Sequence, residues 1–91
     1  MKVPFEVEQL ITGFHPGSAH EYATHEEWIA AHLARKKDWQ KEVIRRFLDE
    51  LLSGRHSDEE IQEVWQMQYP SYDFSAGGHR WFFTKIREAL G

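Results

Sequence analysis

Apolar residues recur at intervals of three or four along most of this chain of 91 residues, which is the spacing of an amphipathic α-helix. No segment alternates apolar and polar positions with the β-branched enrichment of a strand. The pattern therefore predicts an all-α fold, a compact bundle of four to five helices. Because domains usually contain roughly 100–200 residues, residues 1–91 are expected to form a single domain.

The first predicted helix begins at Pro4, a residue that suits a first helical turn. Its apolar positions are Val7, Leu10, Ile11 and Phe14. Gly13 and the run His15-Pro16-Gly17-Ser18 are typical of a helix end. Residues 15–23 are therefore expected to form a loop.

Residues 25–53 contain no helix breaker. Thr24, just before them, and Glu27 suggest a capping box in which the Glu27 carboxylate reaches back to Thr24. One helix of this length would measure about 45 Å. A domain of this size has a radius of gyration near roughly 12 Å, so such a helix would protrude. We therefore expect a break between Arg35 and Asp38, with Asp38 as the candidate N-cap.

Two further helices are predicted in the C-terminal part of the chain. Ser57 and Glu60 form a second capping-box pair, and Pro70 stops the helix that follows. Residues 71–78 are rich in turn formers, and their two final glycines are expected to give backbone freedom or a close approach to a neighbour. The last helix is expected over about residues 79–90.

The predicted core combines the apolar faces of these helices and is rich in aromatic rings. Its members are Leu10, Ile11, Trp28, Trp39, Val43, Phe47, Leu51, Ile61, Val64, Trp65, Phe82, Phe83, Ile86 and Leu90. A short chain buries a thin core, but each buried ring removes about 150–250 Å² from water. His32 continues the apolar stripe of Trp28, so we expect it at the core edge with a hydrogen-bond partner.

Composition narrows the class of protein. The absence of cysteine excludes disulfides, thiolate zinc sites and cysteine nucleophiles. The N-terminus lacks a signal-peptide pattern, and no apolar run approaches the roughly 18 residues of a membrane span. We therefore expect a soluble cytoplasmic protein that does not insert into a membrane.

The sequence offers no catalytic arrangement that can be assembled from its residues. His15, His20 and His25 recur every five residues, a spacing that turns successive helical side chains by about 140° and does not converge them on a metal. The carboxylates fall in helix first turns or on polar faces, and no serine has a base and an oxyanion donor beside it. We therefore expect no enzyme activity, no metal and no cofactor.

The net charge is −4, and carboxylates lie beside aromatic residues in two parts of the chain. Such surfaces suit a protein partner rich in Lys and Arg. The candidate partner-binding residues are Glu21, Tyr22, Glu26, Glu27, Asp58, Glu59, Glu63, Tyr69, Tyr72 and Asp73. The alternative interpretation is acidity that merely caps helix N-termini.

The C-terminal segment also carries a family resemblance. The residues concerned are Ser57-Asp58-Glu59-Glu60-Ile61, Trp65, Asp73-Phe74, Gly77-Gly78, Arg80, Phe82-Phe83 and Ile86-Arg87. This run resembles the C-terminal part of small bacterial immunity proteins of contact-dependent growth-inhibition systems, and the first fifty residues carry none of it. The resemblance implies a protein that binds and blocks a toxin domain without catalysis. The predicted function is thus a small acidic interaction module, an immunity or inhibitor protein that neutralises a basic toxin or nuclease domain.

A DNA-binding helix-turn-helix module of phage or plasmid type, formed by residues 57–67 and 79–90, is the alternative. Its candidate nucleic-acid-binding residues are Lys36, Lys41, Arg80, Lys85 and Arg87. The link between the helices exceeds the usual three- or four-residue turn, and the acids of the first helix would repel phosphate. Residues 35–46 are locally basic and could follow a phosphate backbone, although acids at i+3 and i+4 favour a solvated helix face.

Overall fold

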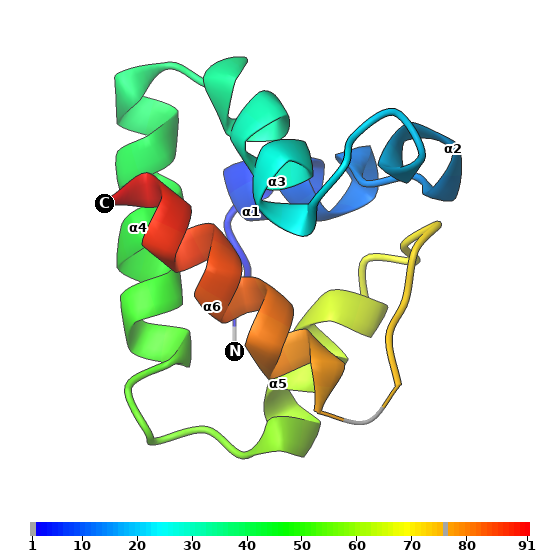
Figure 1. The fold of residues 1–91 in the computed structure, drawn as a ribbon. Coiled ribbons are helices and arrows are strands. Elements are labelled where there is room, and N and C mark those ends of the chain that lie inside the picture. Colours follow the sequence, from blue (N-terminus) through cyan, green and yellow to red (C-terminus); the bar gives the residue numbers. More distant parts are fainter. Residues whose placement is uncertain (1, 76) are drawn as a thin grey trace.

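The computed structural model describes residues 2–75 and 77–91 (Figure 1). Over these residues the chain forms six helices and no strand. They are α1 (Phe5–Gly13), α2 (Pro16–Ala19), α3 (His25–Ala34), α4 (Asp38–Leu51), α5 (Asp58–Gln66) and α6 (Gly78–Leu90). The predicted all-α class is confirmed, with five longer helices and one single-turn helix. None of these helices, in the part of the chain that the structure describes, is long and apolar enough to cross a bilayer.

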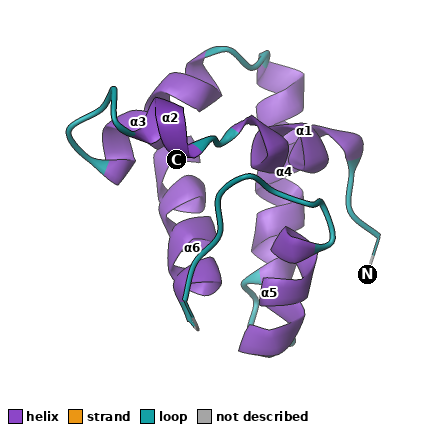
Figure 2. Ribbon diagram, turned by 90° about the vertical axis from the view of Figure 1, so that its right-hand side faces the viewer, coloured by secondary structure: helices purple, strands orange, loops and turns teal. Residues whose placement is uncertain are grey.

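Helix α6 lies at the centre of the bundle. It packs against α3, α4 and α5, while α1 packs on α4 and the short α2 on α3. Figure 1 shows α6 crossing in front of the other helices, and Figure 2 shows α5 at the opposite end of the molecule from the α3–α4 connection. The radius of gyration is 12.2 Å and the extents are 34 × 30 × 20 Å. One core therefore serves all the helices.

The predicted break in residues 25–53 is confirmed. Helix α3 ends at Ala34, and α4 begins at Asp38 after a turn. The N-cap of α4 is Lys37, so the expectation that Asp38 caps the helix was wrong. Asp38 instead occupies the first helical position, where its charge favours the helix dipole. The Lys37 amide is satisfied by the side chain of Gln40, which accepts its hydrogen bond at 2.7 Å.

Helix capping follows the sequence closely at α5 and less closely at α3. The Ser57 hydroxyl accepts from the Glu60 amide at 3.2 Å, and the Glu60 carboxylate accepts from the Ser57 amide at 3.1 Å. At α3 the Thr24 hydroxyl accepts from the Glu27 amide as expected, but the Glu27 carboxylate accepts from Ala23 and not from Thr24. Glu27 therefore secures the loop one residue earlier than predicted.

Residues 15–23 differ from the expected loop because they contain the single turn α2. Pro16 at the first helical position supplies a helical φ. The His15 carbonyl accepts from the Ser18 and Ala19 amides and from the Ser18 hydroxyl. The Ser18 hydroxyl oxygen in turn accepts from the Trp28 indole at 3.1 Å, which ties α2 to α3.

Aromatic rings fill the centre of the core. Phe82 lies 5.1 Å from Phe14 and 5.6 Å from Trp65, both edge-on, and Phe14 lies 4.9 Å from Trp28. Edge-to-face pairs at these separations are favourable for aromatic quadrupoles. The buried apolar residues are Val7, Leu10, Ile11, Phe14, Trp28, Ile29, Leu33, Ile44, Phe47, Leu48, Leu51, Ile61, Val64, Trp65, Phe82, Phe83 and Ile86. Most of the predicted core is confirmed.

Three predicted core residues on α4 and α6 are less buried than expected. Trp39 is 57% exposed, while Val43 and Leu90 are only half-buried. The predicted apolar stripe of α4 placed one residue every four positions. On a helix of 3.6 residues per turn, each such step rotates the side chain by about 40° around the helix axis. Three such steps separate Trp39 from the buried Leu51, so its indole points away from the core. The buried face of α4 runs instead through Ile44 and Leu48.

The glycine pair before α6 has two distinct roles. Gly77 caps the helix with a φ of 84°, a left-handed conformation that favours glycine. A Cβ on Gly78 would lie 2.6 Å from the Cβ of Phe74, so only glycine fits there without a shift. Both roles expected for this pair, backbone freedom and close approach, are confirmed.

Candidate partner-binding surface

The ten candidate partner-binding residues lie in three places. Glu21, Tyr22, Glu26 and Glu27 lie before and at the start of α3, Asp58, Glu59 and Glu63 on α5, and Tyr69, Tyr72 and Asp73 in the link between α5 and α6. The structure brings part of the second group together with part of the third. It gives several of the remaining residues structural roles.

An open groove lies along the exposed side of α5 and its C-terminal end. Its lining residues are Glu59, Gln62, Glu63, Gln66, Met67 and Tyr69. Within the described residues, the carboxylates of Glu59 and Glu63 form no ion pair and accept no hydrogen bond. Met67 is 50% exposed and Tyr69 is 93% exposed. We call this surface the α5 groove.

A small hollow adjoins the α5 groove and gives it an apolar floor. It has a volume of about 90 Å³ and is lined by Leu51, His56, Glu60, Glu63, Val64 and Met67. Glu63 and Met67 belong to both surfaces. The His56 ring lies between two carboxylates, 3.2 Å from Glu60 and 3.6 Å from Glu50. The surroundings of the groove therefore combine apolar contact area with negative charge.

Tyr69 is held outward by an unusual backbone conformation. Its φ is 52°, a left-handed value that among the described non-glycine residues occurs at Tyr69 alone. The left-handed region costs a residue with a Cβ about 1–2 kcal/mol. The Tyr69 amide donates to the Gln66 carbonyl at 3.1 Å, which closes the end of α5, and Pro70 follows at once. The ring gains almost no burial in return for this strain.

Asp73 is engaged within the protein. Its carboxylate accepts from His79 Nε2 at 2.5 Å, from Gln66 Nε2 at 2.9 Å and from the Phe74 amide at 2.9 Å. Burial by itself raises the pKa of Asp73, but the hydrogen bonds from His79, Gln66 and Phe74 outweigh it, so that the pKa is lowered. Because a carboxylate only accepts, the proton lies on Nε2 of His79. Asp73 thus fastens the link to α6, and its side chain remains 46% exposed.

His79 is the functionally placed residue that sequence reasoning missed. Its side chain is 2% exposed, and its Nδ1 has no hydrogen-bond partner in the described residues. Phe74 packs edge-on against its ring at 5.4 Å. No signal in the sequence singled out His79, because no spacing rule links it to Asp73 across a turn.

Asp58 also has a structural role. It forms an ion pair with Arg80, whose guanidinium donates in addition to the His56 carbonyl at 3.0 Å. These contacts fasten the start of α5 to α6. Asp58 therefore differs from its neighbour Glu59, which faces the groove without a cation.

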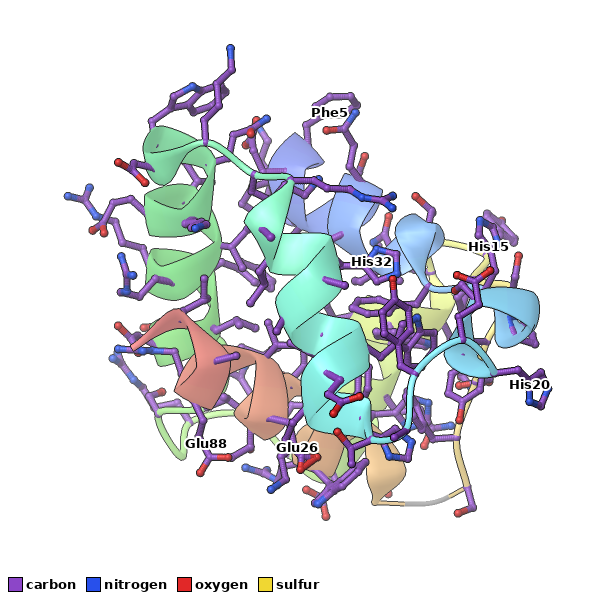
Figure 3. All side chains as sticks on the ribbon, turned by 45° about the horizontal axis from the view of Figure 1, so that its top comes forward. Phe5, His15, His20, Glu26, His32 and Glu88 are labelled. Atoms are coloured by element: carbon purple, nitrogen blue, oxygen red, sulfur yellow. The ribbon has the colours of Figure 1, made fainter. Side chains whose placement is uncertain are left out.

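The candidate residues near α3 also include some with a structural role and some that are exposed. Tyr22 is half-buried against the core, and Glu27 caps the loop before α3. Glu21 and Glu26 are exposed, and Figure 3 shows Glu26 at the outer edge of the molecule. From the linker, Tyr72 packs edge-on against Trp28 at 5.1 Å. This part of the surface has exposed carboxylates, and the ring near it is that of Trp81, which is 44% exposed and packs edge-on against His25 at 5.1 Å.

The alternative nucleic-acid-binding residues on α6 are engaged as well. Arg80 pairs with Asp58, Arg87 pairs with Asp49 at 2.5 Å, and Lys85 lies 3.9 Å from Glu88 and 5.9 Å from the centre of the Trp81 ring. Helix α6 also packs against three other helices. A DNA-reading helix needs an exposed polar face, so the contacts of α6 give a helix-turn-helix role little support. Lys36 and Lys41 lie elsewhere, around the start of α4.

His32 lies half-buried at the core edge, as expected, with its ring 4.5 Å from that of Phe14. The expected hydrogen-bond partner is absent from the described residues. Burial lowers the pKa of His32, and the nearby cations Arg35, Lys36 and His15 lower it further. Among the described residues, no group of three or more His, Cys, Asp or Glu side chains is arranged to hold a metal ion.

The chain matches no protein-family model, no curated protein sequence and no solved structure. Its functional interpretation therefore depends on the surfaces described above.

Proposed function

We propose that this protein is a small acidic interaction module whose α5 groove binds a basic protein partner. The observation that carries the proposal is the pair Glu59 and Glu63, two carboxylates without an ion pair in the part of the chain that the structure describes, beside the exposed side chains of Met67 and Tyr69. A partner's Lys or Arg side chain supplies the missing positive charge. No catalytic role is assigned to any residue.

The chemistry of the groove suits such a partner. Opposite charge steers association and raises the rate of encounter. The flexible thioether of Met67 adapts to the shape of an apolar side chain. The face of the Tyr69 ring attracts a cation, with about 0.5–1 kcal/mol at an exposed site and more when water is excluded. The groove thus offers both charge and contact area to one basic side chain and its neighbours.

Two other candidate acids, Asp58 and Asp73, differ from Glu59 and Glu63 because they already have intramolecular partners. Asp58 and Asp73 are occupied by Arg80 and His79. A side chain that already compensates a cation contributes less to binding, because a partner must displace the existing pair. Within the described residues, Glu59 and Glu63 therefore keep unpaired negative charge beside the exposed ring of Tyr69, as Glu6 and Glu8 do beside the exposed Phe5.

The more specific part of the proposal is that the module is an immunity or inhibitor protein for a basic toxin or nuclease domain. It is supported by the resemblance of residues 57–91 to immunity proteins of contact-dependent growth-inhibition systems. The segment that carries the resemblance is also the segment that forms the α5 groove. A nuclease domain, whose own substrate is polyanionic, presents the positive surface that such a groove needs.

The test is a titration of this protein into the purified product of the neighbouring gene, followed by an activity assay of that product. We expect stoichiometric binding and loss of the partner's activity. Glu63→Gln should weaken binding by at least tenfold, whereas Glu88→Gln, an equal charge change at an exposed site on α6, should change it by less than about twofold. No binding at physiological salt, or equal effects of the two variants, contradicts the proposal.

A further inference from the structure

The turn between α3 and α4 concentrates cationic side chains that have no carboxylate partner. We call residues 35–41 the α3–α4 corner. Its four bases are Arg35, Lys36, Lys37 and Lys41. Within the described residues none of them forms an ion pair, whereas Arg45, Arg46, Arg55, Arg80, Lys85 and Arg87 each have a carboxylate partner. The corner contains one acid, Asp38, so its charge remains clearly positive.

The neighbouring part of α4 shows why the corner stands apart. Glu42 accepts from both Arg45 and Arg46, at 2.5 and 3.0 Å, and these hydrogen bonds lower its pKa. Glu42, the carboxylate that follows the corner in the helix, is thus used by the bases after it. Within the described residues, Lys37 at the N-cap and Lys41 in the first turn of α4 form no ion pair.

An exposed indole lies among these cations. Trp39 occupies the first turn of α4 and is 57% exposed, whereas Trp28 and Trp65 are buried. Lys37 and Lys41 flank it in the sequence. An accessible aromatic ring beside phosphate-binding cations is the combination with which proteins hold single-stranded nucleic acid, because a base stacks on the ring while the cations contact the backbone.

A basic pocket continues the corner toward α1. It has a volume of about 330 Å³ and is lined by Gln9, Leu10, Gly13, His15, His32, Arg35 and Lys36. Figure 3 shows His15 and His32 on the same side of the molecule. The lining contains no carboxylate. An anion seated here would provide His32 and its cationic neighbours with the partner that the fold does not supply.

The corner is also distant from the surface already assigned. In Figures 1 and 2 the α3–α4 connection lies at one end of the molecule and α5 at the other. The N-terminus of the 14-residue helix α4 adds a positive field to the corner. The two ends of the protein therefore present charges of opposite sign, and a ligand of the corner need not compete with a partner at the α5 groove.

We propose that the α3–α4 corner binds single-stranded nucleic acid, with phosphates on Arg35, Lys36, Lys37 and Lys41 and a base stacked on Trp39. A single strand fits better than a duplex, because the corner offers one short turn and one ring, and the exposed face of α4 beyond it carries the acids Asp49 and Glu50. The binding does not depend on the function proposed for the α5 groove. With about four phosphate contacts, the logarithm of affinity should fall with the logarithm of salt concentration with a slope near −3.

The test measures fluorescence anisotropy of a labelled oligothymidylate of about 20 nucleotides with the full chain at increasing salt. Trp39→Ala should weaken binding by about tenfold through loss of stacking. Lys37→Gln/Lys41→Gln should reduce the salt slope by about 1.4, since each phosphate contact contributes about 0.7. The matched control is Arg46→Gln, an exposed base on the same helix whose guanidinium pairs with Glu42; it should change affinity by less than about twofold.

Four results would overturn the proposal. The first is no anisotropy change at about 50 mM salt with about 100 μM protein, and the second is an Arg46→Gln effect equal to that of the lysine variant. The third is an affinity that Trp39→Ala leaves unchanged. The fourth is binding of duplex DNA or polyglutamate as tight as binding of the oligonucleotide. The last two would indicate a general polyanion surface without base stacking. The far-UV circular dichroism spectrum of each variant should match that of the wild type, so that a loss of binding can be attributed to the corner and not to unfolding. A failure to bind the basic partner at α5 would leave these outcomes unaffected.

Discussion

On one face of α5, Ile61, Val64 and Trp65 are buried, whereas the other face leaves Glu59 and Glu63 without a cation. The buried face is held by aromatic contacts, by the capping box and by the Asp58–Arg80 pair. The open face continues into the strained Tyr69, which the fold does not need for packing. The comparison teaches that the same helix separates residues that stabilise the fold from residues without an ion pair in the described chain, which we propose for partner binding.

The largest effect is expected on the buried face, at Trp65. Its ring packs against Phe82 and Phe83, and its indole donates to the Tyr72 carbonyl at 2.7 Å. Trp65→Ala should reduce the free energy of unfolding by about 3–5 kcal/mol. Chemical denaturation measures the change, with the exposed Trp39→Ala as the matched control and an expected loss below about 0.5 kcal/mol. Equal melting temperatures for wild type and Trp65→Ala would remove this residue from the core.

The second effect concerns the link that carries Tyr69 and Tyr72. Asp73→Asn exchanges a carboxylate that accepts three hydrogen bonds for a weaker acceptor and should cost about 1–3 kcal/mol. Glu88→Gln provides an exposed control with little expected change. A loss no greater than that of the control would show that the Asp73–His79 contact does not hold the link.

The same residue makes stability depend on pH. Because the folded pKa of Asp73 lies below its ordinary value of 3.8, its contribution is complete above that value and is lost as the pH falls through the folded pKa. Wild type should therefore lose more stability than Asp73→Asn between about pH 4 and 2. Denaturation curves of the two proteins at several pH values measure the difference, and parallel curves would contradict it.

A smaller effect of opposite sign is expected at Tyr69. Tyr69→Gly should raise the free energy of unfolding by up to about 1 kcal/mol, because glycine relieves the left-handed strain but gains entropy in the unfolded chain. Tyr69→Ala removes the ring and keeps the strain, so it should not stabilise. Both variants should bind the basic partner more weakly. A loss of stability in Tyr69→Gly would mean that the ring packs usefully and that the two faces are less distinct.

The smallest stability effect is expected at the groove acids themselves. Glu59→Gln and Glu63→Gln should each change the free energy of unfolding by less than about 0.5 kcal/mol, because neither carboxylate has an intramolecular partner. Asp58→Asn removes the pair with Arg80 and should cost up to about 1 kcal/mol, the usual limit for an exposed ion pair. Thermal melts of the three variants compare them. A larger loss at Glu63 than at Asp58 would reverse the assignment of roles.

Local signals in the sequence predicted the elements well. The Ser57–Glu60 capping box, the break after Ala34 and the two glycines before α6 all depend on short-range chemistry, and each is confirmed. The error at Trp39 came from extending an i+4 series across a helix, where the accumulated rotation exceeds the width of the buried face.

The candidate surface could be predicted only in part. Acids beside aromatic residues indicated α5 and the link, but the sequence could not distinguish Glu59 from Asp58, because the difference is the position of Arg80 on another helix. The contact between Asp73 and His79 and the left-handed backbone of Tyr69 likewise depend on how the link folds over α6. These features arise from tertiary contacts, which no local spacing encodes.

The most direct test follows the backbone amide chemical shifts of this protein while the purified product of the neighbouring gene is added. The account predicts that the largest shifts fall on residues 59–69, along the open face of α5 and at Tyr69, with little change at α6 residues 84–90. Shifts centred on α6, or no shifts with saturating partner, would contradict the claim that the α5 groove is the binding surface.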